Sequence, residues 1–183
     1  MKKICLLLFG LMTCFILTGC SSEKEMTKVD KITTDILVSN FNQNLVENNI
    51  EYPASEESLI KDNGVYWYTL YEDIDLYFYV ENYTEDKSKD IVIESGLFYD
   101  KDSVNYNLVK KYLYYLLKAN NSELTIDEIN EMIEKAIEYE NSSDPNLEKN
   151  EGKGYSKKGI MIAHWQNDTE NHFSVTRIYE KEN

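Results

Sequence analysis

Cysteine is confined to the first 20 residues of this 183-residue sequence, at Cys5, Cys14 and Cys20. The chain after Cys20 can therefore form no internal disulfide, and its stability must come from packing alone. The start of the sequence also lacks an apolar run long enough to span a membrane as a helix. The nearly uninterrupted run from Ile4 to Leu17 is shorter than the roughly 20 residues that a membrane-spanning helix needs.

Sequence patterns for common catalytic sites are missing as well. There is no Gly-x-Ser-x-Gly nucleophile elbow, no His-Glu-x-x-His zinc pattern and no glycine-rich phosphate loop. The only two histidines are His164 and His172, which fall on two predicted neighbouring strands, where His164 could approach His172 or Phe173. A structural role for His164 is favoured, and the sequence predicts no metal ion and no cofactor.

Basic residues are scarce compared with acidic ones. Lysine and arginine number 19 against 33 aspartate and glutamate, a formal charge of -14. Such a chain is repelled by nucleic acid and by anionic lipid surfaces, so no nucleic-acid partner is expected. If charge selects a partner, that partner is a cationic peptide or protein, or a metal ion. The alternative is that acidity only keeps an exported protein soluble.

The first 20 residues have the organisation of an export signal. Lys2 and Lys3 precede the apolar run, which ends in Leu17-Thr18-Gly19-Cys20. This ending resembles the lipobox of bacterial lipoproteins. The resemblance implies cleavage before Cys20, attachment of diacylglycerol to its thiol, and anchoring by acyl chains such as palmitate on the outer face of a bacterial membrane. The alternatives are an uncleaved apolar anchor, or a plain signal peptide with an incidental cysteine.

The expected organisation is a signal peptide over 1–19, a lipidated cysteine with a short tether over 20–27, and a single domain over 28–183. Apolar periodicity predicts helices over 29–50, 103–118 and 125–139, the second capped by Ser103 and the third by a Thr125/Glu128 capping box. Alternation predicts strands over 65–70, 74–80, 90–98, 159–166 and 172–179, with a long loop over 141–158. The fold class is therefore α+β: an antiparallel sheet of about five strands in the order α-β-β-β-α-α-β-β, with helices packed on one face.

Tyrosine is unusually frequent, with 15 copies. If Glu72 and Asp73 form a two-residue hairpin loop, Trp67 pairs with Phe78 on one face of the sheet. The other face then carries a ladder of four tyrosines, namely Tyr66, Tyr68, Tyr77 and Tyr79. The ladder is a candidate binding surface, because rigid amphipathic rings supply contact area at low entropic cost. The alternative is that helices cover the ladder, in which case the Trp67 side is the open one.

Two small groups of oxygen-bearing side chains stand at turns. One is Asp100 and Asp102 with Asn105, and the other is Glu72, Asp73 and Asp75 at the hairpin. Neither has the spacing of a calcium loop, so helix capping or a solvated turn is the favoured interpretation.

Together these features favour a membrane-anchored, cell-surface lipoprotein that acts as a non-enzymatic binding or interaction module. One alternative is a lipid-anchored hydrolase whose carboxylates or histidines converge only in three dimensions. Another is an immunity or inhibitor lipoprotein that captures a cationic peptide or a secreted enzyme.

Overall fold

The computed structural model describes residues 29–51, 53–62, 64–71, 75–82, 91–102, 104–140 and 154–179. Their helical elements are α2 (Thr34–Glu47), η1 (Glu56–Ser58), α3 (Tyr106–Asn120) and α4 (Ile126–Glu140). Their strands are β1 (Leu59–Asp62), β2 (Val65–Tyr71), β3 (Leu76–Asn82), β4 (Val92–Asp100), β5 (Tyr155–Lys157), β6 (Ile160–Gln166) and β7 (Glu170–Arg177). The predicted α+β class is confirmed.

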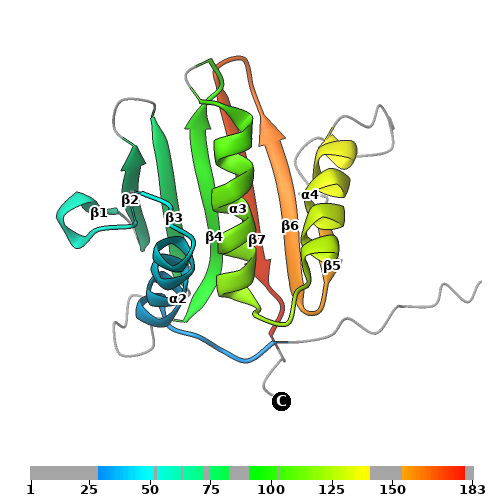
Figure 1. Cartoon of the computed structure of the whole chain (residues 1–183), viewed down its shortest axis with the longest axis horizontal. Helices are drawn as coiled ribbons and strands as arrows, with labels where there is room; N and C mark the ends of the chain where they lie inside the picture. Colours follow the sequence, from blue (N-terminus) through cyan, green and yellow to red (C-terminus); the bar gives the residue numbers. More distant parts are fainter. Residues whose placement is uncertain are drawn as a thin grey trace, which may run out of the picture.

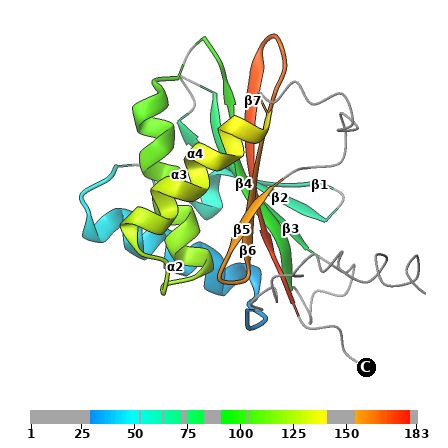
Figure 2. The ribbon, with the colours of Figure 1, turned by 90° about the vertical axis from the view of Figure 1, so that its right-hand side faces the viewer.

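The strands form one sheet in the order β1-β2-β3-β4-β7-β6-β5. Every neighbouring pair is antiparallel. The helices α2, α3 and α4 all lie against the same face of this sheet, as the edge-on view shows (Figures 1 and 2). We call this side the helix face and the opposite side the open face, because no helix of the described residues covers the latter.

The core lies between the sheet and the helices. Strand β3 sends Leu76, Phe78 and Val80 to the helix face, and each is fully buried. Helix α2 meets them with a similarly buried stripe that includes Phe41, whose ring centroid lies 4.7 Å from that of Phe78. Alternate strand residues and helix residues three or four apart are thus buried together, as each element's geometry requires.

The helix termini match the predicted signals in part. At the start of α4, the Thr125 N–H donates to Glu128 Oε2 at 2.8 Å and the Glu128 N–H donates to Thr125 Oγ1 at 3.3 Å, so the capping box is confirmed. The start of α3 is capped by Asn105, whose side chain accepts from the Asn107 N–H. The predicted cap Ser103 lies outside the described residues.

The prediction of five strands is wrong, because the sheet has seven in the described residues. The two additional strands, β1 and β5, are its edges and contain four and three residues. Segments this short cannot show a convincing alternation of apolar and polar residues, and β5 lies within the segment predicted as a loop. The element order therefore gains one strand before β2 and one before β6.

The segment before α2 is extended and not helical, because the first helix begins at Thr34 and not near Val29. The Val29 N–H donates to the Ile178 carbonyl at 3.0 Å, and the guanidinium of Arg177 donates to the Asp30 carbonyl at 2.6 Å. These bonds fasten the start of the described chain to the end of β7.

Candidate binding surface

The pairing of β2 with β3 differs from the predicted register by one residue. Trp67 pairs with Tyr79, and Tyr68 pairs with Phe78. An irregularity between Thr69 and Tyr71 shifts the register and replaces the predicted symmetric hairpin. Because side chains alternate between faces, a one-residue shift moves every β3 side chain to the other side relative to β2.

The predicted ladder of four tyrosines is therefore wrong. Tyr66 and Tyr68 point to the helix face, where Tyr68 is 2% exposed and stacks on Phe78 with centroids 5.5 Å apart. Tyr77 and Tyr79 lie on the open face. The observed register is the one that buries Phe78 beneath the helices, whereas the predicted register would have placed it beside Trp67.

An aromatic cluster occupies the middle of the open face. We define it as Trp67, Tyr77, Tyr79, Phe98, Trp165 and His172, contributed by the five strands β2, β3, β4, β6 and β7. Neighbouring ring centroids lie 5.1 to 6.5 Å apart. Trp165 is 46% exposed, and most of the other rings are half-buried. The cluster thus presents ring surface that no helix of the described ranges covers.

Gly96 allows the ring of Tyr79 to pack directly on the backbone of β4. A side chain at this position would begin 2.4 Å from Cε1 of Tyr79 and 2.3 Å from the Phe173 carbonyl oxygen. The Tyr79 ring instead lies across the bare backbone, which buries it to 4% exposure. Its hydroxyl thereby reaches two polar groups, Glu94 and His172.

The Tyr79 hydroxyl donates to Glu94 Oε1 at 2.7 Å and lies 2.5 Å from His172 Nε2. A phenol has one proton to donate, and Tyr79 donates it to Glu94. The Tyr79 oxygen can then only accept from His172, which requires the neutral imidazole tautomer that carries its hydrogen on Nε2. Burial and the nearby Glu94 charge raise the pKa of Tyr79 well above its usual value, and burial lowers the pKa of His172. At neutral pH the chain holds a neutral phenol and a neutral imidazole beside one carboxylate.

Carboxylates stand at both ends of the aromatic cluster. Glu81 lies directly opposite Glu94 across the β3/β4 ladder, and Asp100 lies directly opposite Glu170 across the β4/β7 ladder. Like charges placed opposite each other destabilise a sheet, so each pair has a cost in the isolated protein. A positive ligand group placed between the two carboxylates of a pair would relieve that cost.

The open face has no lysine or arginine among its described strand residues. Its central members, identified by register, are Trp67, Thr69, Tyr77, Tyr79, Glu81, Glu94, Gly96, Phe98, Asp100, Met161, Ala163, Trp165, Glu170, His172, Ser174 and Thr176. The strand cations Lys61, Lys157 and Arg177 lie on the helix face: Lys61 pairs with Tyr66, and both Lys157 and Arg177 pair with Ile160. Among the described strand residues, the open face therefore combines aromatic rings and small or polar side chains with charge of negative sign alone.

Comparisons with protein-family models, curated proteins and solved structures found no match to this chain. Its function can therefore be inferred only from its own residues.

The two histidines lie on opposite faces. His164 pairs with Phe173 and stacks on it with centroids 4.3 Å apart, on the helix side of the sheet. Burial lowers the pKa of His164 to about 4, with a small contribution from His172. The predicted approach of His164 to Phe173 is confirmed, and a shared site with His172 is not formed.

The remaining candidates have simpler surroundings. Asp100 Oδ1 accepts from the Asp102 N–H at 2.8 Å, as in a turn. Glu72, Asp73 and Cys20 lie outside the described residues. Within the described part of the chain, no group of three or more metal-ligating side chains is found, and no helix is long and apolar enough to cross a membrane.

Sequence reasoning missed Phe98, Trp165 and His172 as members of one surface. Each alternates with buried residues along its strand, which signals an outward position. What brings them together is the pairing of β4 with β7, two strands separated by two helices and two further strands in the chain.

Proposed function

We propose that this chain is a membrane-anchored, non-enzymatic lipoprotein of the bacterial cell surface whose open face binds a cationic peptide or protein. The observation that carries the proposal is the make-up of the open face. It combines half-exposed rings with two opposed carboxylate pairs and has no cation among its described strand residues.

The chemistry of these residues selects lysine- or arginine-rich partners. A guanidinium or ammonium group can lie over a tryptophan or tyrosine ring, and arginine can also bind a carboxylate in a bidentate manner. Trp67 and Trp165 offer the rings, while the Glu81/Glu94 and Asp100/Glu170 pairs offer the charge. This matches both the general binding module and its special case, an immunity or inhibitor protein.

The hydrolase alternative is less well supported by the described contacts. A nucleophilic site needs a base free to take a proton from its nucleophile. The described side chain that contacts His172 Nε2 is Tyr79, and the raised pKa of Tyr79 keeps it a neutral phenol, which is a poor nucleophile. Two hollows lined by described residues, one over α3 and one beside Arg177, have no histidine in their lining.

The binding proposal is tested with hexa-arginine, titrated calorimetrically into the full chain in neutral detergent. We expect the double variant Glu81→Gln/Glu170→Gln to bind at least tenfold more weakly. The matched control Asp127→Asn/Glu134→Gln removes the same charge from exposed positions of α4 and should change affinity less than twofold. Equal weakening by both doubles would mean that only net charge matters, and would overturn the proposal.

The ring contribution is tested separately with Trp165→Ser, because Trp165 is the most exposed ring of the cluster and its loss should leave the core intact. We expect a severalfold loss of hexa-arginine affinity with an unchanged unfolding midpoint. Unchanged affinity would exclude the cluster as the contact surface.

The anchor is tested with Cys20→Ala, because lipid attachment needs the thiol. We expect the variant to remain an unlipidated precursor that leaves the detergent phase on phase separation. If the alanine variant is processed and partitions into detergent like the unaltered chain, the lipoprotein assignment is wrong.

A further inference from the structure

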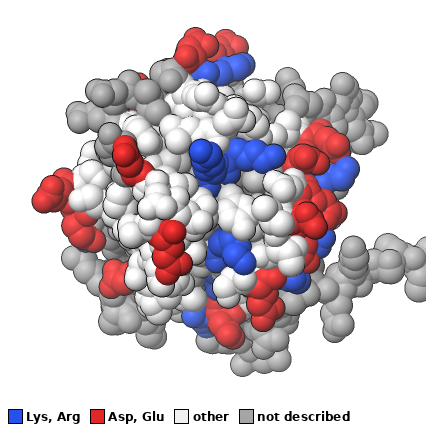
Figure 3. Space-filling view, in the orientation of Figure 1, with Lys and Arg blue, Asp and Glu red and all other residues white. Residues whose placement is uncertain are grey.

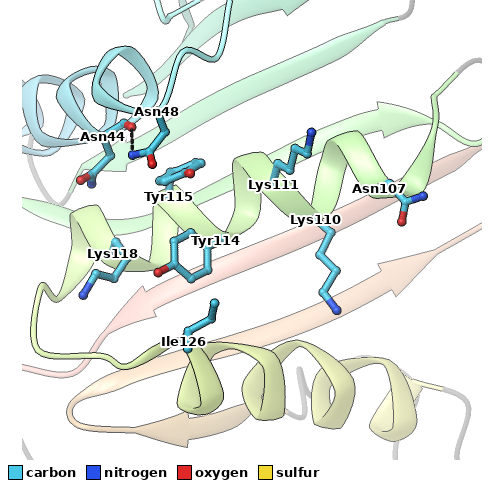
Figure 4. Close-up of a pocket in the computed structure, with 9 residues that line it drawn as sticks. All are labelled: Asn44, Asn48, Asn107, Lys110, Lys111, Tyr114, Tyr115, Lys118 and Ile126. Carbon is cyan, nitrogen blue, oxygen red and sulfur yellow. Dashed lines mark hydrogen bonds between the residues drawn. The ribbon is translucent and has the colours of Figure 1, made fainter.

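The helix side carries a hollow of opposite character to the open face. It measures about 680 Å³ and lies over α3, bordered by the C-terminal half of α2 and by the first residue of α4 (Figure 4). Pockets of this size hold a small organic molecule. Its lining includes Asn44, Lys110, Lys111, Tyr114, Tyr115 and Ile126.

Charge on the helices is distributed unequally. Helix α3 contains three lysines and no aspartate or glutamate, whereas α4 contains six carboxylates and one lysine. Figure 3 shows basic side chains gathered in the middle of the helix side, over α3, with acidic side chains toward the rim over α4. In a chain of net charge -14, this is a local positive area that an anion can reach.

Two of the three lysines are available to a ligand. Lys118 is held by the carbonyls of Ser122 and Leu124, to which its Nζ donates at 2.6 and 2.7 Å. Lys110 and Lys111 have no ion-pair partner among the described residues, although 33 carboxylates are present in the chain. Their ammonium groups have donors to offer to an oxyanion.

Each of these lysines has a tyrosine one turn further along α3. Lys110 and Tyr114 are four residues apart, as are Lys111 and Tyr115, so each pair shares one side of the helix. In Figure 4, Lys110 and Tyr114 extend toward the α4 side and Lys111 and Tyr115 toward the α2 side. Ile126 adds an apolar surface that is 59% exposed. The hollow thus offers cations beside rings.

We propose that this hollow binds a small organic anion that joins a phosphate or carboxylate to an aromatic or aliphatic group. Lys110, on the α4 side of the hollow, takes the oxyanion, and Tyr114 and Ile126 on the same side take the apolar part. The site is separate from the open face, and it binds the opposite charge.

Phenyl phosphate is the probe, titrated calorimetrically into the full chain in neutral detergent, with inorganic phosphate and phenol as the two half-probes. We expect phenyl phosphate to bind more tightly than either half-probe. Lys110→Gln should weaken it at least tenfold, whereas Lys110→Arg should retain most of the affinity and Lys111→Gln, on the other side of α3, should change it less than threefold. Lys135→Gln, which removes the lysine of α4 that pairs with Glu138, is the matched control and should change affinity less than twofold.

The proposal is overturned if phenyl phosphate does not bind at millimolar concentration, or if Lys110→Gln binds it as well as the unaltered chain. Phenol binding as tightly as phenyl phosphate would also overturn it, because Lys110 would then have no role. Circular dichroism of each variant verifies that the fold is retained, which is expected because both lysines project from the surface of α3.

Discussion

Gly96→Ala is the substitution that most directly tests the architecture of the open face. The added Cβ would lie 2.3 Å from the Phe173 carbonyl oxygen and 2.4 Å from Tyr79 Cε1. The first neighbour is backbone of the adjacent strand, so it cannot move without disturbing the β4/β7 ladder. The second is a buried ring, which would have to leave the surface of β4.

The expected cost has two parts. Overpacking a tight site by one methyl group costs about 1–3 kcal/mol. Moving the Tyr79 ring also removes its hydroxyl from the Glu94 carboxylate, and a hydrogen bond to a charged group contributes about 1.5–3 kcal/mol. The free energy of unfolding should therefore fall by on the order of 4 kcal/mol, a large part of the stability of a domain this size.

Urea unfolding followed by circular dichroism measures this cost, and the midpoint should fall by about 2 M if the slope is near 2 kcal/mol per molar. Gly64→Ala is the matched control. Gly64 has φ +84° and nothing within 4 Å of an added Cβ, so alanine there meets only backbone strain of about 1–2 kcal/mol. A Gly96→Ala cost no larger than that of Gly64→Ala would refute the close packing of Tyr79 on β4.

Two further predictions concern single side chains. Tyr68→Ser should lower the free energy of unfolding by about 3 kcal/mol or more, because Tyr68 is buried. Tyr77→Ser should lower it by only about 1 kcal/mol, because Tyr77 is half-exposed. Equal costs in thermal or urea melts would contradict the observed register. His164 has a folded pKa of about 4, below its ordinary 6.5, so the unfolded chain takes up the proton first and stability present above pH 6.5 is lost as the pH falls toward 4. Between pH 7 and pH 5, the free energy of unfolding should fall less in His164→Gln than in the unaltered chain, by on the order of 1 kcal/mol for this partly exposed ring. Urea melts at both pH values that give the same fall for the two chains would refute the lowered pKa of His164.

Elements with strong local signals were predictable. The apolar stripe of α4 and its Thr125/Glu128 box are contained within a few consecutive residues, so tertiary contacts had little left to decide. The same holds for the hairpin of β6 and β7, where Asn167 Oδ1 accepts from the N–H groups of Thr169 and Glu170.

The face of each strand residue was harder to predict, because it depends on register. One irregularity between Thr69 and Tyr71 shifts the pairing of β2 with β3 by one residue, so two of the four tyrosines lie on each face and the predicted ladder does not form. A second irregularity, between Glu81 and Asn82, similarly interrupts the alternation at the start of β4, where Val92 is buried on the helix face. Local alternation identified most of the strands, but it does not show where a bulge shifts the register, so it could not predict which face each residue occupies.

The way the described chain begins determines how an anchored domain would present its two surfaces. Val29 and Asp30 are fastened at the end of the sheet where β7 finishes, and not over either face (Figure 1). With lipid on Cys20, the nine Cα–Cα steps to Val29 would span at most about 32 Å, so that end of the sheet, and neither face, would be the part tethered to the bilayer.

This placement predicts that anchoring leaves the open face accessible. Hexa-arginine should bind the lipidated chain in phosphatidylcholine vesicles within about twofold of its affinity in neutral detergent, since a neutral lipid surface adds no charge of its own. The comparison uses vesicles carrying the chain on their outer surface, and bare vesicles serve as the blank. An affinity more than tenfold lower in vesicles would mean that the open face turns toward the bilayer, and a cationic partner would then have to compete with the membrane for the aromatic cluster.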